Sequence, residues 1–328
     1  MTTKQSSGSS GDDTTGIANG TTTTSNAIDS GRLTRFFGVL VALVIGFTAV
    51  VWAVDVSILA AGPLYMFTPA IAAVVVCRHA GISLSTVGLR IGRKRWLAIA
   101  AVIWLPLAGV IFVLSLGVPG VGFDSSVDVA AELGLPGSGP GWSIAAVGLM
   151  VAIGATVNAI FAFGEEFGWR GYLLWELSPL GFWKASLVIG TVWGLWHAPL
   201  IVAGLNYPSF PYVGVLMFTV VCIAISPLFT YLVLRGESVL PAAVFHGVFN
   251  AAGLVLVTTE STVLRELVVG EGGVVGVFVF GLVALAIAVA GTPALTRAFA
   301  SMESQRPRSG RSTATDRQAG AGAVGEQG

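Results

Sequence analysis

Charged residues, histidines and cysteines are scarce in this sequence, and each shortage excludes a class of protein. Only 10% of the 328 residues are charged and 54% are hydrophobic, which excludes a soluble domain of this size and indicates a polytopic membrane protein. The formal net charge is zero, so we expect no nucleic-acid partner. Cys77 and Cys222 lie in apolar segments without CxxC spacing, so we expect both to be reduced and buried.

Large apolar residues are almost absent from the first 31 residues, which are rich in Ser, Thr and Gly. Such a segment cannot bury enough surface to offset the entropy of ordering, so we expect disordered cytoplasmic tails at 1–31 and 299–328. The start of the chain has no apolar stretch followed by a cleavage site, so we expect no signal peptide. The first apolar run begins at Phe36 and has the length of a membrane anchor.

Long apolar stretches dominate the rest of the chain. A transmembrane helix needs about 20 apolar residues, and about eight stretches reach that length. The sequence therefore predicts an all-α polytopic membrane protein. The expected spans are Phe36 to Val54, Val56 to Cys77, Trp96 to Val118, Trp142 to Phe163, Ala185 to Gly204, Tyr212 to Leu234, Val239 to Thr258 and Gly272 to Leu295.

The basic residues predict the orientation of these spans. If the N-terminus is cytoplasmic, every lysine and arginine except Arg265 falls on the inner side, while the outer loops carry acidic residues such as Asp128 and Glu266. This asymmetry is the positive-inside pattern. We therefore expect a multi-pass protein of the cell membrane with both termini in the cytoplasm.

Two adjacent carboxylates and an arginine follow the fourth apolar stretch, in Glu165-Glu166-Phe-Gly-Trp-Arg170. Ionisable groups at membrane depth are costly, which indicates a function. Glu166 and Arg170 share one helical face and can pair, whereas Glu165 points about 140° away from Arg170. A carboxylate left free in a dry site suits a general base that activates water. The alternative is that all three are ordinary polar residues at a cytoplasmic helix end.

Two of the three histidines lie in later apolar stretches. His197 ends the motif Trp193-Gly-Leu-Trp-His, and His246 and Asn250 are spaced i, i+4. A lone histidine on an apolar helix is more often a core residue than a catalyst, but motifs on three helices are hard to explain by packing alone. His197 and His246 are roughly 18 Å and 12 Å from the inner ends of their spans. We therefore expect the motifs to meet in the cytoplasmic half of the membrane.

In this order, E-E-x-x-x-R, aromatic-x-x-x-H and H-x-x-x-N resemble the motifs of the CAAX-protease and bacteriocin-processing (CPBP) family of intramembrane proteases. The resemblance covers about Trp142 to Thr259 and departs from the family pattern at Trp193, where Phe is usual. It implies endopeptidase activity like that of type II CAAX prenyl endopeptidases. Members are called metalloproteases, although a glutamate-dependent mechanism without a catalytic metal is also proposed for the family. The site residues that the resemblance implies are Glu165, Glu166, Arg170, His197, His246 and Asn250.

The residues themselves leave two mechanisms open. In one, Glu165 and His197 polarise a water that attacks a peptide carbonyl, and His246 and Asn250 donate hydrogen bonds to the oxyanion. In the other, Glu165, His197 and His246 hold Zn²⁺, whose bound water is the nucleophile. The H-E-x-x-H motif is absent, so the sequence does not choose. A secondary transporter with a relay of buried charges and a membrane scaffold without catalysis also stay open.

The expected organisation places a protease core between other spans. Three N-terminal spans and an outer loop occupy 32–141, the CPBP-like core occupies 142–259, and the last span lies within 260–298. The expected partners are the lipid bilayer and a membrane-associated or prenylated peptide or protein that approaches from the cytoplasmic side.

Overall fold

The computed structural model describes residues 27–251 and 256–299. The tails expected at 1–31 and 299–328 lie almost entirely outside these residues. The regular secondary structure of the described residues is helical apart from one short antiparallel strand pair, in which Gly122 lies opposite Thr258. The elements are α1 (Ser30–Ala53), α2 (Gly62–Tyr65), α3 (Thr68–His79), α4 (Lys94–Val102), α5 (Trp104–Leu116), β1 (Gly122–Phe123), α6 (Val129–Glu132), α7 (Pro140–Ile153), η1 (Gly154–Asn158), α8 (Ala159–Glu166), η2 (Phe167–Leu173), α9 (Leu174–Glu176), η3 (Ser178–Leu180), α10 (Gly181–Trp196), α11 (Ala198–Val202), α12 (Pro211–Gly236), α13 (Leu240–Ala251), β2 (Val257–Thr258), η4 (Leu264–Val268) and α14 (Val274–Ala290).

The outer surface of the bundle is apolar. Among the described residues, five helical stretches are long and apolar enough to cross a membrane, and α13 and α14 are shorter apolar helices. Large side chains point outward from them, such as Trp52, which is 84% exposed, and Val289, which is 82% exposed. Such surfaces are stable against lipid and unstable against water. The prediction of an all-α, multi-pass membrane protein is confirmed.

The second expected span, Val56 to Cys77, is not one continuous helix. The chain forms α2 and α3 there, with Met66 and Phe67 between them. Both helices carry a proline in their first turn, Pro63 in α2 and Pro69 in α3. Proline has no N–H to donate and is favoured at that position, so each proline begins a new helix. The length of the apolar run did not reveal this break.

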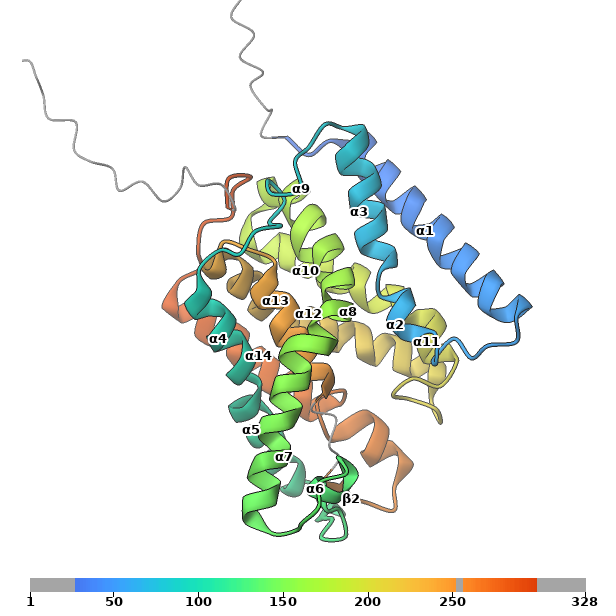
Figure 1. Ribbon diagram of the computed structural model, residues 1–328, viewed down its shortest axis with the longest axis vertical. Helices are drawn as coiled ribbons and strands as arrows, with labels where there is room; N and C mark the ends of the chain where they lie inside the picture. Colours follow the sequence, from blue (N-terminus) through green and yellow to red (C-terminus); the bar gives the residue numbers. More distant parts are fainter. Residues whose placement is uncertain (1–26, 252–255, 300–328) are drawn as a thin grey trace, which may run out of the picture.

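The core of the bundle is built around α12. Helix α10 packs along α12, and α13 packs against α12, α8 and η1 (Figure 1). The crossing of α13 and η1 is close: a Cβ added at Gly154 would lie 2.6 Å from the Cα of Val248. Only glycine allows this approach. It holds the His246 turn of α13 against the helix that carries the two glutamates.

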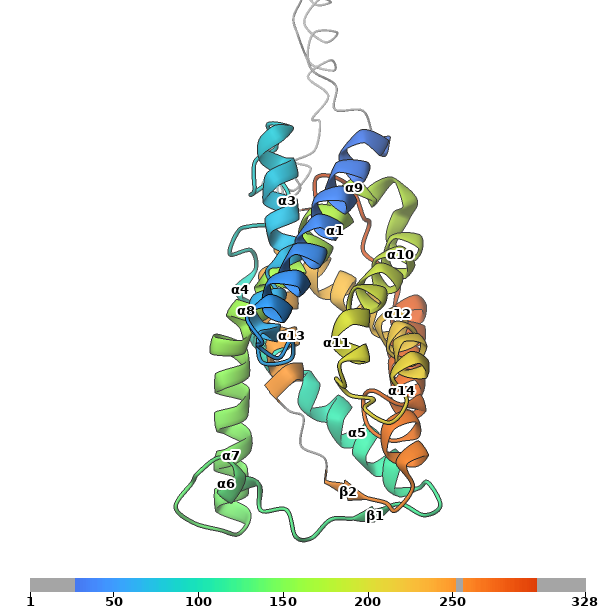
Figure 2. The same cartoon turned by 90° about the vertical axis from the view of Figure 1, so that its right-hand side faces the viewer.

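The two ends of the bundle differ. The first and last described segments meet at one end, where Arg297 Nη2 donates to the carbonyl oxygen of Ala27 at 2.6 Å. We call this the tail end. The strands β1 and β2 lie at the opposite end, which we call the loop end (Figure 2).

A buried carboxylate fastens the tail end. Glu176, at the end of α9, is fully buried. It accepts hydrogen bonds from the backbone N–H of Asp29 at 2.8 Å, from Arg32 Nε at 2.7 Å and from Arg297 Nη2 at 2.9 Å. We call these four residues the anchor cluster. It joins three segments that are far apart in the sequence.

Candidate active site in the membrane core

Glu165 and Glu166 end α8, and the seven-residue π-helix η2 follows them directly. π-helical turns are rare and frequent at functional sites, where the extra residue redirects side chains. The helical path continues beyond the carboxylates through α9. Glu165, Glu166 and Arg170 are each at most 1% exposed. This burial excludes the alternative of solvated polar residues at a helix end.

Glu166 and Arg170 form the buried ion pair that their spacing predicts. Arg170 Nη1 lies 3.0 Å from Glu166 Oε1. The guanidinium lies 4.3 Å from the ring centroids of both Trp193 and Phe229, and its Nη2 donates to Ser226 Oγ at 3.2 Å. Two aromatic faces and a hydroxyl therefore replace water around the cation.

His246 shares the same carboxylate oxygen. Its Nδ1 lies 2.8 Å from Glu166 Oε1, a contact that the sequence did not predict. Glu166 is thus held by Arg170 from its own helical segment and by His246 from α13. Because Nδ1 contacts Glu166, Nε2 is the ring nitrogen of His246 that is available to contact a substrate.

Glu165 is not the free carboxylate that the sequence predicts. Its Oε2 accepts a hydrogen bond from Trp193 Nε1 at 2.6 Å, and His197 Nε2 lies 4.0 Å from the same oxygen. His197 Nδ1 lies 2.8 Å from the backbone carbonyl oxygen of Trp193. A carbonyl can only accept, so Nδ1 carries the proton, and Nε2 of the neutral ring is an acceptor turned towards Glu165.

His197 lies at a break between two helices. Helix α10 ends at Trp196, and α11 begins at Ala198 with Pro199 in its first turn. Pro199 explains the interruption, because proline removes a helical hydrogen bond. The break places the imidazole in the bundle interior, where it is only 7% exposed.

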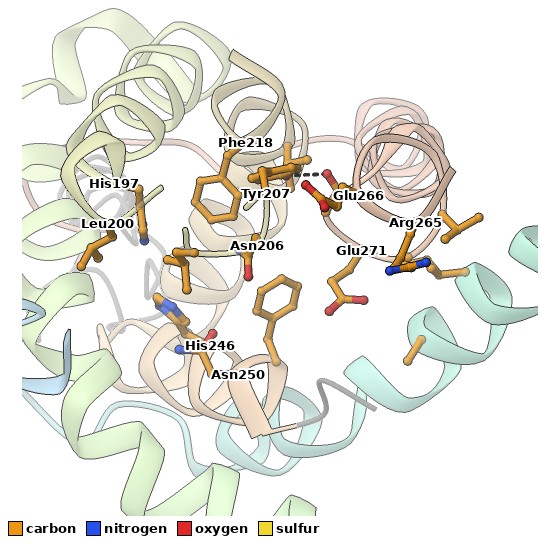
Figure 3. A pocket seen from close by; sticks show the side chains of 18 of the residues that line it. His197, Leu200, Asn206, Tyr207, Phe218, His246, Asn250, Arg265, Glu266 and Glu271 are labelled. Atoms are coloured by element: carbon orange, nitrogen blue, oxygen red, sulfur yellow. Dashed lines mark hydrogen bonds between the residues drawn. The ribbon is translucent and has the colours of Figure 1, made fainter. Parts of the chain in front are cut away.

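A cavity of about 740 Å³ lies beside these residues. Glu165, His197, His246 and Asn250 line it, and Figure 3 shows both histidines and Asn250 on one side of the space. Glu166 and Arg170 are absent from the lining and fully buried. The structure therefore brings the predicted site residues together in two layers. Four of them face the cavity, and the ion pair lies behind them.

The cavity becomes more polar away from the histidines. The Tyr207 hydroxyl there donates to the carbonyl oxygen of Gly272 at 2.6 Å, and Glu271 extends into the same region (Figure 3). Burial raises the pKa of the Tyr207 phenol and of the Glu271 carboxyl above their ordinary values. Tyr207 therefore stays protonated and continues to donate at neutral pH.

The expected zinc ligands do not fit a metal site in this geometry. Across residues 27–251 and 256–299, no three His, Cys, Asp or Glu side chains are grouped closely enough to hold a metal ion. Trp193 donates to Glu165, and His246 directs Nδ1 to Glu166. A catalytic zinc site needs three protein ligands at about 2.0–2.2 Å from the ion. Glu165, His197 and His246 do not provide that set.

Trp193 is the site residue whose role the sequence did not reveal. The sequence showed it only as a departure from the family pattern, but its indole N–H reaches Glu165. A phenylalanine at this position would leave the carboxylate without that donor. The signal was available, because tryptophan adds a polar atom to an aromatic ring. The contact of His246 with Glu166 bridges two helices, and no local pattern shows it.

Comparisons with known proteins identify a family that is similar to the segment carrying these residues. The family model of the Rce1-like type II CAAX prenyl endopeptidases matches residues 141–252, which contain every predicted site residue. This segment, about a third of the chain, is therefore similar to the CAAX protease-like family. CAAX prenyl protease 2 of Methanococcus maripaludis is 32% identical over 109 residues, which are 31% of this chain and 40% of the relative. The chain thus matches less than half the length of that relative, and α1 to α5 and α14 lie outside the CAAX protease-like segment.

Proposed function

We propose that this chain is an intramembrane endopeptidase of the CAAX type, which hydrolyses a peptide bond in a membrane-associated or prenylated peptide or protein. The matched family and the relative named CAAX prenyl protease 2 support a hydrolase of this type. One observation carries the mechanism. Two hydrogen-bond acceptors, Glu165 Oε2 and His197 Nε2, lie 4.0 Å apart on the cavity wall.

A water molecule fits this gap as a shared donor. At an ordinary hydrogen-bond distance of about 2.8 Å from both acceptors, it would direct its two O–H bonds about 90° apart, close to their natural angle. Each acceptor attracts one proton of the water and shifts the electrons of that O–H bond towards the oxygen, which makes the oxygen a better nucleophile. Glu165 and His197 together then act as the general base.

In the proposed reaction, the water oxygen attacks the carbonyl carbon of the scissile peptide bond. One proton passes to Glu165, and the carbonyl oxygen becomes an oxyanion. Glu165 then returns the proton to the nitrogen, the oxyanion collapses to a carbonyl, and the C–N bond breaks to give a carboxylic acid and an amine. His246 Nε2 and the Asn250 amide, both on the cavity wall, stabilise the oxyanion with hydrogen bonds.

The buried ion pair of Glu166 and Arg170 positions His246 and balances the charges of the site. When both ring nitrogens of His246 are protonated, Nδ1 donates to Glu166 and Nε2 donates into the cavity. Arg170 and His246 then balance Glu165 and Glu166, so the cluster is neutral. Neutrality matters because an unbalanced charge at membrane depth is costly. The aromatic faces around Arg170 keep its guanidinium fixed behind Glu166.

Peptide hydrolysis by the purified protein tests the proposal. The full chain in lipid nanodiscs is assayed with a panel of fluorogenic prenylated and unprenylated peptides, beside Glu165→Gln and with metal analysis of both samples. We expect hydrolysis of at least one peptide by the wild-type chain, none by the variant, and no loss with a chelator. If removal of a bound metal abolished turnover and Zn²⁺ restored it, the metal mechanism would replace this one. If the folded protein cleaved no peptide, a transport or scaffold role would gain.

A further inference from the structure

The cavity contains a carboxylate that the proposed mechanism does not use. Glu271 lines the cavity, and Figure 3 shows its side chain across the space from His197 and His246. No side chain in the described part of the chain forms a hydrogen bond or an ion pair with this carboxylate. Burial raises the pKa of the Glu271 carboxyl, and no neighbouring cation lowers it. A carboxylate that loses water without gaining a partner is costly, so its place in the cavity indicates a role in binding.

The charged residues beside Glu271 in the sequence are already paired. Glu266 Oε2 accepts from the backbone N–H of Ser209 at 2.9 Å, and its Oε1 accepts from Ser209 Oγ at 2.6 Å. Arg265 Nη2 donates to the carbonyl oxygen of Thr259 at 2.9 Å, and its side chain is exposed, so water screens its charge. Glu266 therefore fastens η4 to the 205–210 loop, whereas Glu271 has no such structural role.

The backbone holds Glu271 in place from both sides. On one side, the N–H of Gly270 donates to Ser115 Oγ of α5 at 3.1 Å, and the φ of +75° at Gly270 is a conformation that glycine adopts easily. On the other side, the Tyr207 hydroxyl donates to the carbonyl oxygen of Gly272 at 2.6 Å. A group that is held in position before a ligand arrives loses less entropy when the ligand binds. Glu271 is thus preorganised for a partner.

Glu271 lies outside the segment that matches the protease family, which ends at residue 252. Two aromatic rings lie between it and the proposed base. The ring centroid of Phe218 is 4.7 Å from that of His197 and 6.3 Å from that of Tyr207, which contacts the residue next to Glu271. An extended peptide covers about 3.3–3.6 Å per residue. A substrate group that contacts Glu271 is therefore a few residues away from the bond that is cleaved.

We propose that Glu271 forms a cation-binding subsite, which selects peptides that carry a lysine or an arginine a few residues from the scissile bond. The ammonium or guanidinium group gives the carboxylate the partner that it lacks, through a charge-assisted hydrogen bond. The rings of Phe218 and Tyr207 contact the methylene groups of the same side chain. This proposal rests on the proposed function, because the peptide is the substrate of the proposed endopeptidase.

A lysine scan of a peptide substrate tests the subsite. A peptide that the full chain cleaves in nanodiscs is made with lysine at each position on either side of the cleavage site in turn. A matched set carries acetyl-lysine, which keeps the length of the side chain and removes its charge. The kcat/KM of each pair is measured for the wild type, Glu271→Gln and Glu271→Asp, and for Glu266→Gln as the control carboxylate. Thermal shift shows that each variant is folded.

At one or two neighbouring positions we expect the wild type to cleave the lysine peptide about 10 to 100-fold better than the acetyl-lysine peptide. Glu271→Gln should lose this preference, whereas Glu271→Asp should keep part of it and Glu266→Gln should keep it fully. Equal cleavage of the two sets at every position would overturn the proposal. An unchanged preference in Glu271→Gln would also overturn it, because the cation would then bind elsewhere.

A charge reversal and a binding measurement complete the test. Glu271→Lys should prefer a glutamate peptide at the position where the wild type prefers lysine, and a remaining preference for lysine would contradict the subsite. Fluorescence anisotropy then compares the binding of lysine and acetyl-lysine versions of the peptide panel to Glu165→Gln, with and without Glu271→Gln. If the wild type cleaves no peptide, the proposed function fails. The subsite then stands if binding shows a preference for lysine that requires Glu271, and it fails if binding shows none.

Discussion

Glu166 and Glu176 are both fully buried beside arginines, but their surroundings differ in how completely they satisfy the carboxylate. Both oxygens of Glu176 accept hydrogen bonds, from Arg32, Arg297 and the backbone of Asp29. Glu166 receives Arg170 and His246 on the single oxygen Oε1. Among the described residues, Glu166 Oε2 and Arg170 Nε have no hydrogen-bond partner.

This difference separates a structural cluster from a functional one. A buried carboxylate whose two oxygens both accept hydrogen bonds fixes one arrangement of the chain, whereas a buried carboxylate with an unsatisfied oxygen costs stability and persists where function requires it. The anchor cluster therefore stabilises the fold. The cluster around Glu165 and Glu166 lowers the stability of the fold, because it keeps its charged groups in the arrangement that catalysis needs. Each prediction below tests this contrast.

The largest expected effect is on turnover, at His197. We expect His197→Ala to lower kcat by about 10² to 10⁴-fold, the usual loss when a general base is removed. His246→Ala should lower kcat as well, because the oxyanion would lose the donor at Nε2 and Glu166 would lose its link to the cavity. Arg32→Ala, in the anchor cluster, is the matched control and should cleave at the wild-type rate per folded molecule. Near-normal turnover of His197→Ala in the peptide assay would contradict the assignment of this cluster to catalysis and of the anchor cluster to stability.

The next effect is on stability and distinguishes the two ion clusters. Removing one member of a buried pair costs about 3 to 5 kcal/mol, whereas removing both can cost much less. Glu166→Ala and Arg170→Ala should each lower Tm in detergent, and the double variant should lose less than the sum. Glu176→Ala should also lower Tm, but adding Arg297→Ala should not restore it, because that carboxylate joins three segments. Thermal shift measures all five variants, and additive losses at Glu166 and Arg170 would refute the pairing.

The local features of the site were largely predictable from the sequence. The spacing of Glu166 and Arg170 predicts their ion pair, and Pro199 predicts the break at His197, because both depend on neighbours within one or two helical turns. The motif order predicts that three helices meet. The structure confirms these three geometric expectations.

Contacts between distant segments were not predictable in this way. The hydrogen bond from Trp193 to Glu165 and the contact of His246 with Glu166 depend on how helices rotate against each other. The anchor cluster joins Arg32 to Glu176 across 144 positions. No periodicity in an apolar chain encodes such pairings.

A smaller effect on turnover is expected at Asn250. Asn250→Ala should lower kcat by about 10² to 10³-fold, as for the loss of one oxyanion donor, and leave KM nearly unchanged. The side chain faces the cavity, so Tm should change little. A rise in KM without a fall in kcat would assign Asn250 to substrate binding instead.

The smallest expected effect is at Trp193. Trp193→Phe keeps the ring against Arg170 but removes the N–H donated to Glu165, and the loss of one hydrogen bond to a charged group costs about 1.5 kcal/mol, or about tenfold in kcat. The indole ¹⁵N–H resonance of Trp193, assigned by its absence in this variant, should shift in Glu165→Gln. An unchanged resonance would show that the two side chains do not interact.

The most direct test of the central claim compares Glu165→Gln with Glu176→Gln, since each removes the charge of one buried carboxylate and keeps its shape. Turnover per folded molecule and Tm are measured for both in the same membrane preparation. The account predicts that Glu165→Gln loses cleavage with Tm close to wild type, because glutamine still accepts from Trp193. It predicts that Glu176→Gln lowers Tm and retains turnover. Near-normal cleavage by Glu165→Gln, or loss of cleavage by folded Glu176→Gln, would contradict the division between catalytic and structural carboxylates.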